Sequence, residues 1–325
     1  MSSVATRPLL QVTDLCVDYL TEGAPVRAVD NVSLELSRGE FLGVVGESGC
    51  GKSTLLYAIA KLLTPPARIA SGDVWFDGHD IVSMSDAELR HLRWRQYSVV
   101  MQSAMNALNP VMTVGEQLRD TFDAHEHYSA QQVKARSEEL LRLVGIDQVH
   151  LRSYPHQLSG GMRQRAMIAM ALALTPDLVI MDEPTSALDV VAQRSLMVKI
   201  KQLQREFGFA AIFVTHDMSL VSQFSDRLAV MYAGEIVEVG PTRQVFNDPQ
   251  HPYTAGLMRS FPSISGPLQP LTGIAGSPPN LADPPAGCRF NPRCPHVMPR
   301  CKVEHPDFYV REDALARCLL LDPRA

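Results

Sequence analysis

Residues 46–53, Gly-Glu-Ser-Gly-Cys-Gly-Lys-Ser, have the types and spacing needed to bind phosphate. Glycines let backbone N–H groups close around an anion, a lysine can pair with β- and γ-phosphates, and a serine hydroxyl can ligate Mg²⁺. This is the Walker A pattern. It predicts nucleotide binding by Gly46, Glu47, Ser48, Gly49, Cys50, Gly51, Lys52, Ser53 and Thr54, with Ser53 on the metal.

A second nucleotide motif follows at residues 178–183, Leu-Val-Ile-Met-Asp-Glu. An apolar strand that ends in two carboxylates is the Walker B pattern, in which Asp182 would support the Mg²⁺ shell. Glu183, at the strand's carboxyl end, would orient or deprotonate the attacking water.

Between these motifs, residues 158–162 read Leu-Ser-Gly-Gly-Met at the start of a helical pattern. Such a turn offers unpaired backbone N–H groups, a hydroxyl and the positive end of a helix dipole, so Ser159, Gly160 and Gly161 form a second phosphate binder. Because the chain already has one phosphate cradle, the second is expected to serve another nucleotide. We therefore expect two ATPase modules that face each other; the simpler alternative is a serine N-cap without a ligand.

The elements that would position these motifs alternate between strands and helices. Half-buried strands are expected at 9–19 and 28–36, in a small antiparallel layer, and buried strands at 41–45, 178–181 and 210–214. Helices are expected at 53–63, 86–94 and 131–144. A helical insert thus interrupts an α/β core, and a proline-punctuated segment after residue 240 is an appended module.

Residues 9–245 together resemble the ATP-binding subunit of an ABC transporter, with Met162 where the commonest signature has glutamine. The resemblance implies a P-loop NTPase (RecA-like) α/β core with an antiparallel β layer and a helical subdomain, plus a small Pro/Cys-rich C-terminal module. The expected boundaries are 1–245 for the ATPase domain, about 92–175 for its helical subdomain, and 246–325 for the module. Ser159, Gly160 and Gly161 would contact the γ-phosphate of ATP bound to a partner's Walker A.

Further positions match the family one by one. Tyr19 would stack on adenine, although a core aromatic is the alternative. Gln102 resembles the Q-loop glutamine, which reaches Mg²⁺ and the attacking water, and residues 186–189 resemble the D-loop. His216 resembles the switch histidine that contacts the γ-phosphate. The catalytic set implied is Lys52, Gln102, Glu183 and His216.

The tail is similar to that of oligopeptide/dipeptide importer ATPases, at 249–257 and 287–295, as are residues 106–110. That group implies a heterodimer with a second ATPase subunit, two membrane permeases and an extracytoplasmic substrate-binding protein. Peptides are the expected cargo; relatives in the group also move nickel or short oligosaccharides.

Four cysteines, Cys288, Cys294, Cys301 and Cys318, follow a C-x5-C-x6-C-x16-C spacing in the module. Four thiolates can hold a [4Fe–4S] cluster, and similar tails in this group carry one. Zinc is the alternative ligand, although its cysteine spacings are usually tighter, and free or disulfide-bonded cysteines are a third possibility.

The composition of the chain limits its possible cellular location and binding partners. The chain has 325 residues, 46% hydrophobic and 20% charged, with a net charge of −5, which argues against broad electrostatic binding of nucleic acid. No secretory signal or uninterrupted apolar span is apparent. We expect a peripheral protein on the cytoplasmic face of the cell (inner) membrane. The competing hypotheses are a soluble ABC ATPase acting on nucleic acid and a redox-sensing binding protein.

Overall fold

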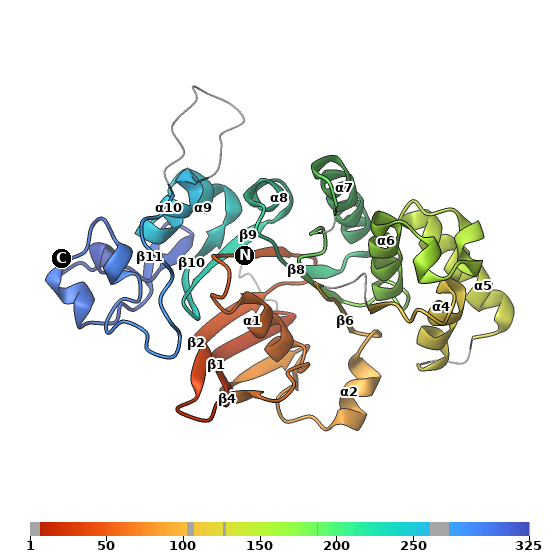
Figure 1. Ribbon diagram of the computed structural model, residues 1–325, viewed down its shortest axis with the longest axis horizontal. Coiled ribbons are helices and arrows are strands. Elements are labelled where there is room, and N and C mark those ends of the chain that lie inside the picture. Colours follow the sequence, from red (N-terminus) through yellow and green to blue (C-terminus); the bar gives the residue numbers. More distant parts are fainter. Residues whose placement is uncertain (1–6, 103–106, 126–127, 187, 261–272, 325) are drawn as a thin grey trace, which may run out of the picture. The chain divides into compact units, whose positions relative to one another are not determined.

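The computed structural model describes residues 7–102, 107–125, 128–186, 188–260 and 273–324. The chain forms two compact units, and Figure 1 labels their helices and strands. Of the described residues, the Walker A unit contains Pro8–Glu35, Leu42–Val82 and those from His216 onward. The Walker B unit contains Arg7, Leu36–Phe41 and the described residues between Ser83 and Thr215. The domain boundaries expected at 92–175 and near residue 245 stay predictions.

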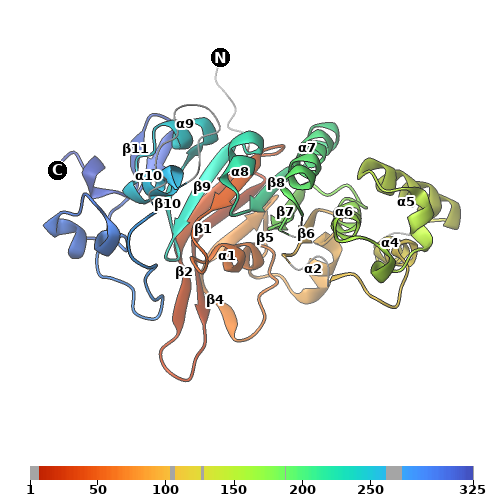
Figure 2. The same cartoon turned by 45° about the horizontal axis from the view of Figure 1, so that its top comes forward.

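The Walker A unit contains an antiparallel four-stranded sheet in the order β2-β1-β4-β5. Its strands are β1 (Leu10–Tyr19), β2 (Val26–Leu36), β4 (Ala67–Phe76) and β5 (His79–Asp80). Helix α1 (Lys52–Ile59) contacts β1 and β4, and both views show it beside them (Figures 1 and 2). This is the antiparallel layer expected from the alternating pattern. Helix α1 ends sooner than the expected residue 63, because Lys61 adopts a positive φ of 48°.

A second run of strands in this unit has the order β11-β12-β10-β9-β3. Strand β3 (Phe41–Val45) pairs in parallel with β9 (Arg227–Tyr232), and β10 (Glu235–Pro241) pairs antiparallel with β9. The short strands β12 (Ala314–Ala316) and β11 (Tyr309–Arg311) then extend the sheet beyond β10. The C-terminal module therefore covers an edge that would otherwise expose unpaired backbone groups.

Helices and single turns cover the rest of the Walker A unit. They are α8 (Met218–Phe224), α9 (Thr242–Asn247), α10 (Pro252–Arg259) and the 3₁₀ turns Asn291–Arg293, Pro299–Lys302 and Leu319–Leu321. The segment that enters α10 is fixed by the buried carboxylate of Glu238, which accepts hydrogen bonds from the backbone N–H groups of Gln250 (2.8 Å) and His251 (2.9 Å). Burial lowers the pKa of His251 to about 3, so its imidazole is neutral and accepts the N–H of Tyr253.

The Walker B unit contains three parallel strands in the order β8-β7-β6. These are β6 (Tyr97–Val100), β7 (Leu178–Asp182) and β8 (Ala210–Val214), and all their residues are buried. Such fully buried, largely apolar strands are typical of parallel strands covered on both faces.

The helices of this unit are α2 (Asp86–Leu92), α4 (Val114–Asp123), α5 (Ala130–Leu143), α6 (Gly160–Ala171) and α7 (Val190–Phe207), with 3₁₀ turns at Gln148–Arg152 and Pro155–Gln157. Ser85, Thr113 and Ser129 begin α2, α4 and α5 with capping boxes. Contacts of α4 and α6 with α5 make a helical cluster, visible in Figure 2. Among the described residues, no helix has the length and apolarity needed to cross a membrane.

Candidate nucleotide site

The Walker A loop joins β3 to α1 and closes around the ammonium group of Lys52. Lys52 Nζ donates to the carbonyl oxygens of Gly46 and Glu47, each at 2.8 Å, and lies 3.6 Å from Cys50 Sγ. The lysine is 9% exposed. An ammonium group held by two backbone carbonyls of this loop is placed to receive phosphate oxygens.

Two glycines make this loop sterically possible. A Cβ at Gly46 would lie 2.2 Å from the carbonyl oxygen of Met231, and one at Gly51 would lie 2.3 Å from that of Ala28. Both residues also have positive φ, 152° and 105°. The glycines of the motif are therefore required by close backbone approach as well as by conformation.

Cys50 is buried within the loop. Desolvation raises the pKa of its thiol, and the nearby Lys52 offsets this only in part. The thiol is therefore protonated at neutral pH, which does not favour redox chemistry at this position.

Tyr19 ends β1 beside the helix that follows the loop. Its hydroxyl lies 3.1 Å from Thr54 Oγ1 on α1. The aromatic residue proposed for adenine thus borders the Walker A helix, while stacking on a base stays a prediction.

At the end of β7 the two acidic residues have different environments. Asp182 is fully buried, whereas Glu183 follows the strand with a φ of 47° and donates its N–H to Val214 O at 2.9 Å. Gln102 Nε2 donates to Glu183 Oε2 at 3.0 Å. Two residues chosen separately from the sequence as catalytic therefore lie in direct contact.

The Ser-Gly-Gly turn begins α6. Ser159 is exposed and caps the helix, since its Oγ accepts the N–H of Met162 at 3.2 Å. Gly161 permits close packing, because a Cβ there would lie 3.1 Å from Leu188 Cδ2. The amide of Gln164, one turn later, donates to Pro184 O. An exposed helix N-terminus can bind an anion, and its contribution to a second nucleotide stays a prediction.

The predicted D-loop includes Ala187, which lies outside the described residues. Of its other members, Asp189 caps α7 by accepting the N–H of Ala192 at 2.9 Å. His216 is exposed and immediately precedes Asp217, the N-cap of α8. Its contact with a γ-phosphate stays a prediction.

ATP and Mg²⁺ fit the donor set by residue type. Hydroxyl, amide and carboxylate oxygens from Ser53, Gln102 and Asp182 are the hard ligands that Mg²⁺ prefers. These residues belong to both units, so their joint coordination of the metal stays a prediction.

The structure does not support the four-cysteine metal site. Among the described residues, which include all four cysteines, no group of three or more His, Cys, Asp or Glu side chains could hold a metal ion. The thiols are free, and Cys301 Sγ instead accepts the N–H of Met298 at 3.5 Å. Burial, with a smaller contribution from the neighbouring cysteines, raises the pKa of Cys288 to about 12 and of Cys318 to about 11. Such protonated thiols do not favour the redox-sensor hypothesis, which needs reactive thiolates.

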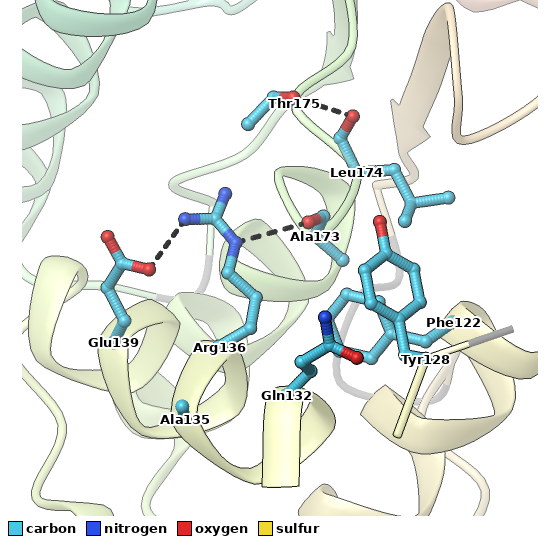
Figure 3. Close-up of a pocket in the computed structure, with 9 residues that line it drawn as sticks. All are labelled: Phe122, Tyr128, Gln132, Ala135, Arg136, Glu139, Ala173, Leu174 and Thr175. Atoms are coloured by element: carbon cyan, nitrogen blue, oxygen red, sulfur yellow. Dashed lines mark hydrogen bonds and ion pairs between the residues drawn. The ribbon is translucent and has the colours of Figure 1, made fainter. Parts of the chain in front are cut away.

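A cavity of about 440 Å³ lies in the Walker B unit between α4, α5 and residues 173–175 (Figure 3). Arg136 crosses it, pairing with Glu139 at 2.8 Å and donating to Ala173 O at 3.4 Å. The residues lining it include none of the sequence-predicted site residues, so this cavity is not the nucleotide site.

Sequence reasoning missed three groups that contact the Walker A loop. Tyr253 and Arg293 bind Glu47 directly, and the N–H of Gly234 donates to Cys50 O at 2.9 Å. The tail motifs that contain Tyr253 and Arg293 were recognised only as a likeness to a family, and nothing local in them points to a loop some 200 residues earlier.

Comparison with known proteins shows the family of this chain. Residues 29–186 match the family described as ABC transporter, and residues 237–301 match the oligopeptide/dipeptide transporter C-terminal region. The dipeptide transport ATP-binding protein DppD of Bacillus subtilis is 43% identical over 98% of this chain and 96% of its own length. The chain belongs to the ABC transporter ATP-binding subunits of the oligopeptide/dipeptide group.

Other relatives give the same result. The oligopeptide transport ATP-binding protein OppD of Escherichia coli is 43% identical over 92% of this chain and 89% of its own. The post-hydrolysis dimer of the ATP-binding cassette MJ0796, bound to ADP and Pi, has a TM-score of 0.66 and 29% identity, covering 72% of this chain and 99% of that one. As an ABC ATPase of this group, the protein is an ATP-hydrolysing transport subunit that works with permease subunits, and its P-loop α/β fold is confirmed.

Proposed function

We propose that this subunit powers the import of oligopeptides or dipeptides. The observation that carries the proposal is the match of residues 237–301 to the C-terminal region of oligopeptide/dipeptide transporters. It is supported by 43% identity, over nearly the whole length of both chains, to a relative named for dipeptide transport. The ATP-binding motifs do not distinguish between cargoes, so nickel and short oligosaccharides are the competing substrates.

In the proposed cycle each ATP is held between the Walker A loop of one ATPase subunit and the signature helix of the other. Lys52 binds the β- and γ-phosphates, and Tyr19 stacks on adenine. Ser159, Gly160 and Gly161 bind the γ-phosphate on a second, related subunit. The exposed, capped N-terminus of α6 supports this trans role.

Hydrolysis needs an oriented water. Glu183 accepts its proton, Gln102 holds Glu183 and the water, and His216 contacts the γ-phosphate. Mg²⁺, when bound by Ser53 and Asp182, neutralises phosphate charge. The 3.0 Å contact between Gln102 and Glu183 supports the shared task. ATP binding closes the dimer and hydrolysis releases it.

The proposed assembly contains this chain, a second homologous ATPase, two permeases and an extracytoplasmic substrate-binding protein. The ATPase pair would lie on the cytoplasmic face of the membrane. Co-purification with permeases supports this assembly, whereas isolation with DNA or ribosomes and without permeases would favour the nucleic-acid alternative.

Cargo is tested by reconstitution. We expect ATPase activity of the complete complex in proteoliposomes to rise severalfold when its binding protein is loaded with a dipeptide or oligopeptide, with accumulation of labelled peptide. Nickel ions and short oligosaccharides serve as parallel cargoes. Stimulation by either of these, without a response to peptides, would contradict the proposed substrate.

We further propose that Cys288, Cys294, Cys301 and Cys318 ligate a [4Fe–4S] cluster, with zinc as the alternative. Two chain segments already meet there: Cys288 N donates to Cys301 O at 2.9 Å, and Gly287 is needed because a Cβ would lie 2.4 Å from that same oxygen. No catalytic step passes through this group.

Metal analysis of anaerobically purified protein tests the ligand. We expect about four iron atoms and four sulfides per chain, lost in Cys288→Ser and Cys318→Ser and retained in Cys16→Ser, which changes a cysteine in β1. Stoichiometric zinc would establish the alternative, and protein free of both metals would refute a metal site.

A further inference from the structure

A residue of the cysteine module holds the Walker A loop. The guanidinium of Arg293 forms a two-pronged ion pair with Glu47, with Nη1 to Oε2 at 2.7 Å and Nη2 to Oε1 at 3.0 Å. Its side chain is 5% exposed and that of Glu47 is 24% exposed. Parallel N–H···O bonds from a planar guanidinium fix the position and the orientation of a carboxylate.

Tyr253 of α10 holds the backbone of the same loop residue. Its hydroxyl accepts the N–H of Glu47 at 2.9 Å, and the residue is fully buried. The ring of Tyr232 lies 4.5 Å from that of Tyr253, and Arg293 Nη1 also donates to the Tyr232 hydroxyl at 3.4 Å. Glu47 is thus held at its side chain and at its backbone.

A second arginine of the module contacts the turn at residues 233–235, which in turn contacts the Walker A loop. Arg289 pairs with Glu235 at 3.0 Å and donates to Ala233 O. Gly234, between these two residues, donates its N–H to Cys50 O. The ring of Phe290 packs against those of Tyr232 and Tyr253, with centroid distances of 5.2 and 5.5 Å. Arg293 therefore contacts the beginning of the loop directly, whereas Arg289 contacts the turn whose Gly234 donates to Cys50.

We propose that residues 288–294, together with Tyr253, position the Walker A loop for ATP, so that the affinity for ATP depends on the contacts of the C-terminal module with Glu47. Arg293 and Tyr253 are positioning residues, because they act through Glu47 and not on the nucleotide. This inference rests on the proposed role of the loop in binding ATP.

The test measures the Kd of Mg-ATP for the full-length protein by calorimetry. Arg293→Lys keeps the charge but loses the two-pronged geometry, and we expect its Kd for Mg-ATP to be about tenfold higher than that of wild type. Arg300→Lys is the matched control: Arg300 makes a similar pair with Glu304, at 2.9 and 3.0 Å, inside the module. Its Kd should stay within about twofold of wild type.

A double-mutant cycle separates positioning from general destabilisation. The Glu47→Gln variant and the double variant, Glu47→Gln with Arg293→Lys, should have the same Kd for Mg-ATP as Arg293→Lys. All three proteins lose the same interaction, the ion pair between Arg293 and Glu47. Additive losses near 100-fold, or an unchanged Kd in Arg293→Lys, would overturn the inference.

Tyr253→Phe covers the case in which Arg293→Lys does not fold, since it removes only the hydroxyl and keeps the ring. It should also weaken ATP binding severalfold, and an unchanged Kd would overturn the inference. Failure of wild type and Arg300→Lys alike to bind Mg-ATP would refute the proposed ATP site itself. If wild type and Arg300→Lys bind Mg-ATP normally, an unchanged Kd in the Arg293 and Tyr253 variants counts only against the positioning role.

Discussion

Replacing Glu183 with glutamine is expected to lower ATP turnover by about two to four orders of magnitude while ATP binding is retained. Glutamine has nearly the same shape but cannot accept a proton from water. The backbone of Glu183 is fixed by its N–H bond to Val214 O, and its side chain lies 3.0 Å from Gln102 Nε2, so the substitution leaves the local framework in place. Bound ATP should then keep the ATPase pair closed.

The measurement combines steady-state phosphate release with ATP binding and with size-exclusion chromatography in Mg-ATP together with the partner ATPase. Glu206→Gln, an exposed carboxylate on α7, is the matched control and should hydrolyse ATP normally. Undiminished turnover in Glu183→Gln would remove Glu183 from the proposed mechanism.

Replacing Gly46 with alanine is expected to weaken ATP binding by about 100-fold. The new methyl group would lie 2.2 Å from the carbonyl oxygen of Met231 and 2.8 Å from Cys50 Sγ, on a backbone with a φ of 152°. Because the Met231 oxygen belongs to strand β9 and cannot rotate away, the loop itself must move. The amides that would bind phosphate move with it.

Gly49→Ala separates this clash from the cost of backbone conformation. Gly49 also has a positive φ, 78°, but a Cβ there meets no atom within 4 Å. We expect a loss of about tenfold or less, which corresponds to left-handed strain alone. Calorimetry of both variants with Mg-ATP makes the comparison, and equal losses would contradict the steric explanation.

The strongest sequence predictions concern patterns that are local. Buried strands β7 and β8 lie within one residue of their expected bounds, and α5 also agrees to within one residue at each end. Hydrophobic period and capping residues determine such elements within a few turns of chain. Strands β11 and β12 were not predicted, since three residues each are too few to show a period, and their pairing depends on the distant β10.

In the nucleotide site, too, local motifs could be recognised from the sequence, whereas contacts between distant residues could not. The sequence identified Glu47 as a member of a phosphate-binding loop, because glycine spacing, lysine and serine encode that loop locally. It also named Gln102 and Glu183 as catalytic, but only the fold brought their side chains to 3.0 Å. The four cysteines show the limit of this approach: their spacing suggested a metal site, yet spacing alone does not determine where four side chains point.

The sequence by itself determined the class of protein, through Walker A, Walker B and the Ser-Gly-Gly helix, since each motif is a short backbone arrangement with chemistry of its own. Only the tertiary structure decided what holds the first of them in place. Arg293 reaches Glu47 across 246 positions of sequence, and no local pattern can encode that contact. It depends on the buried aromatic side chains of Tyr232, Tyr253 and Phe290, which pack against one another only when the C-terminal module folds onto strands β9 and β10.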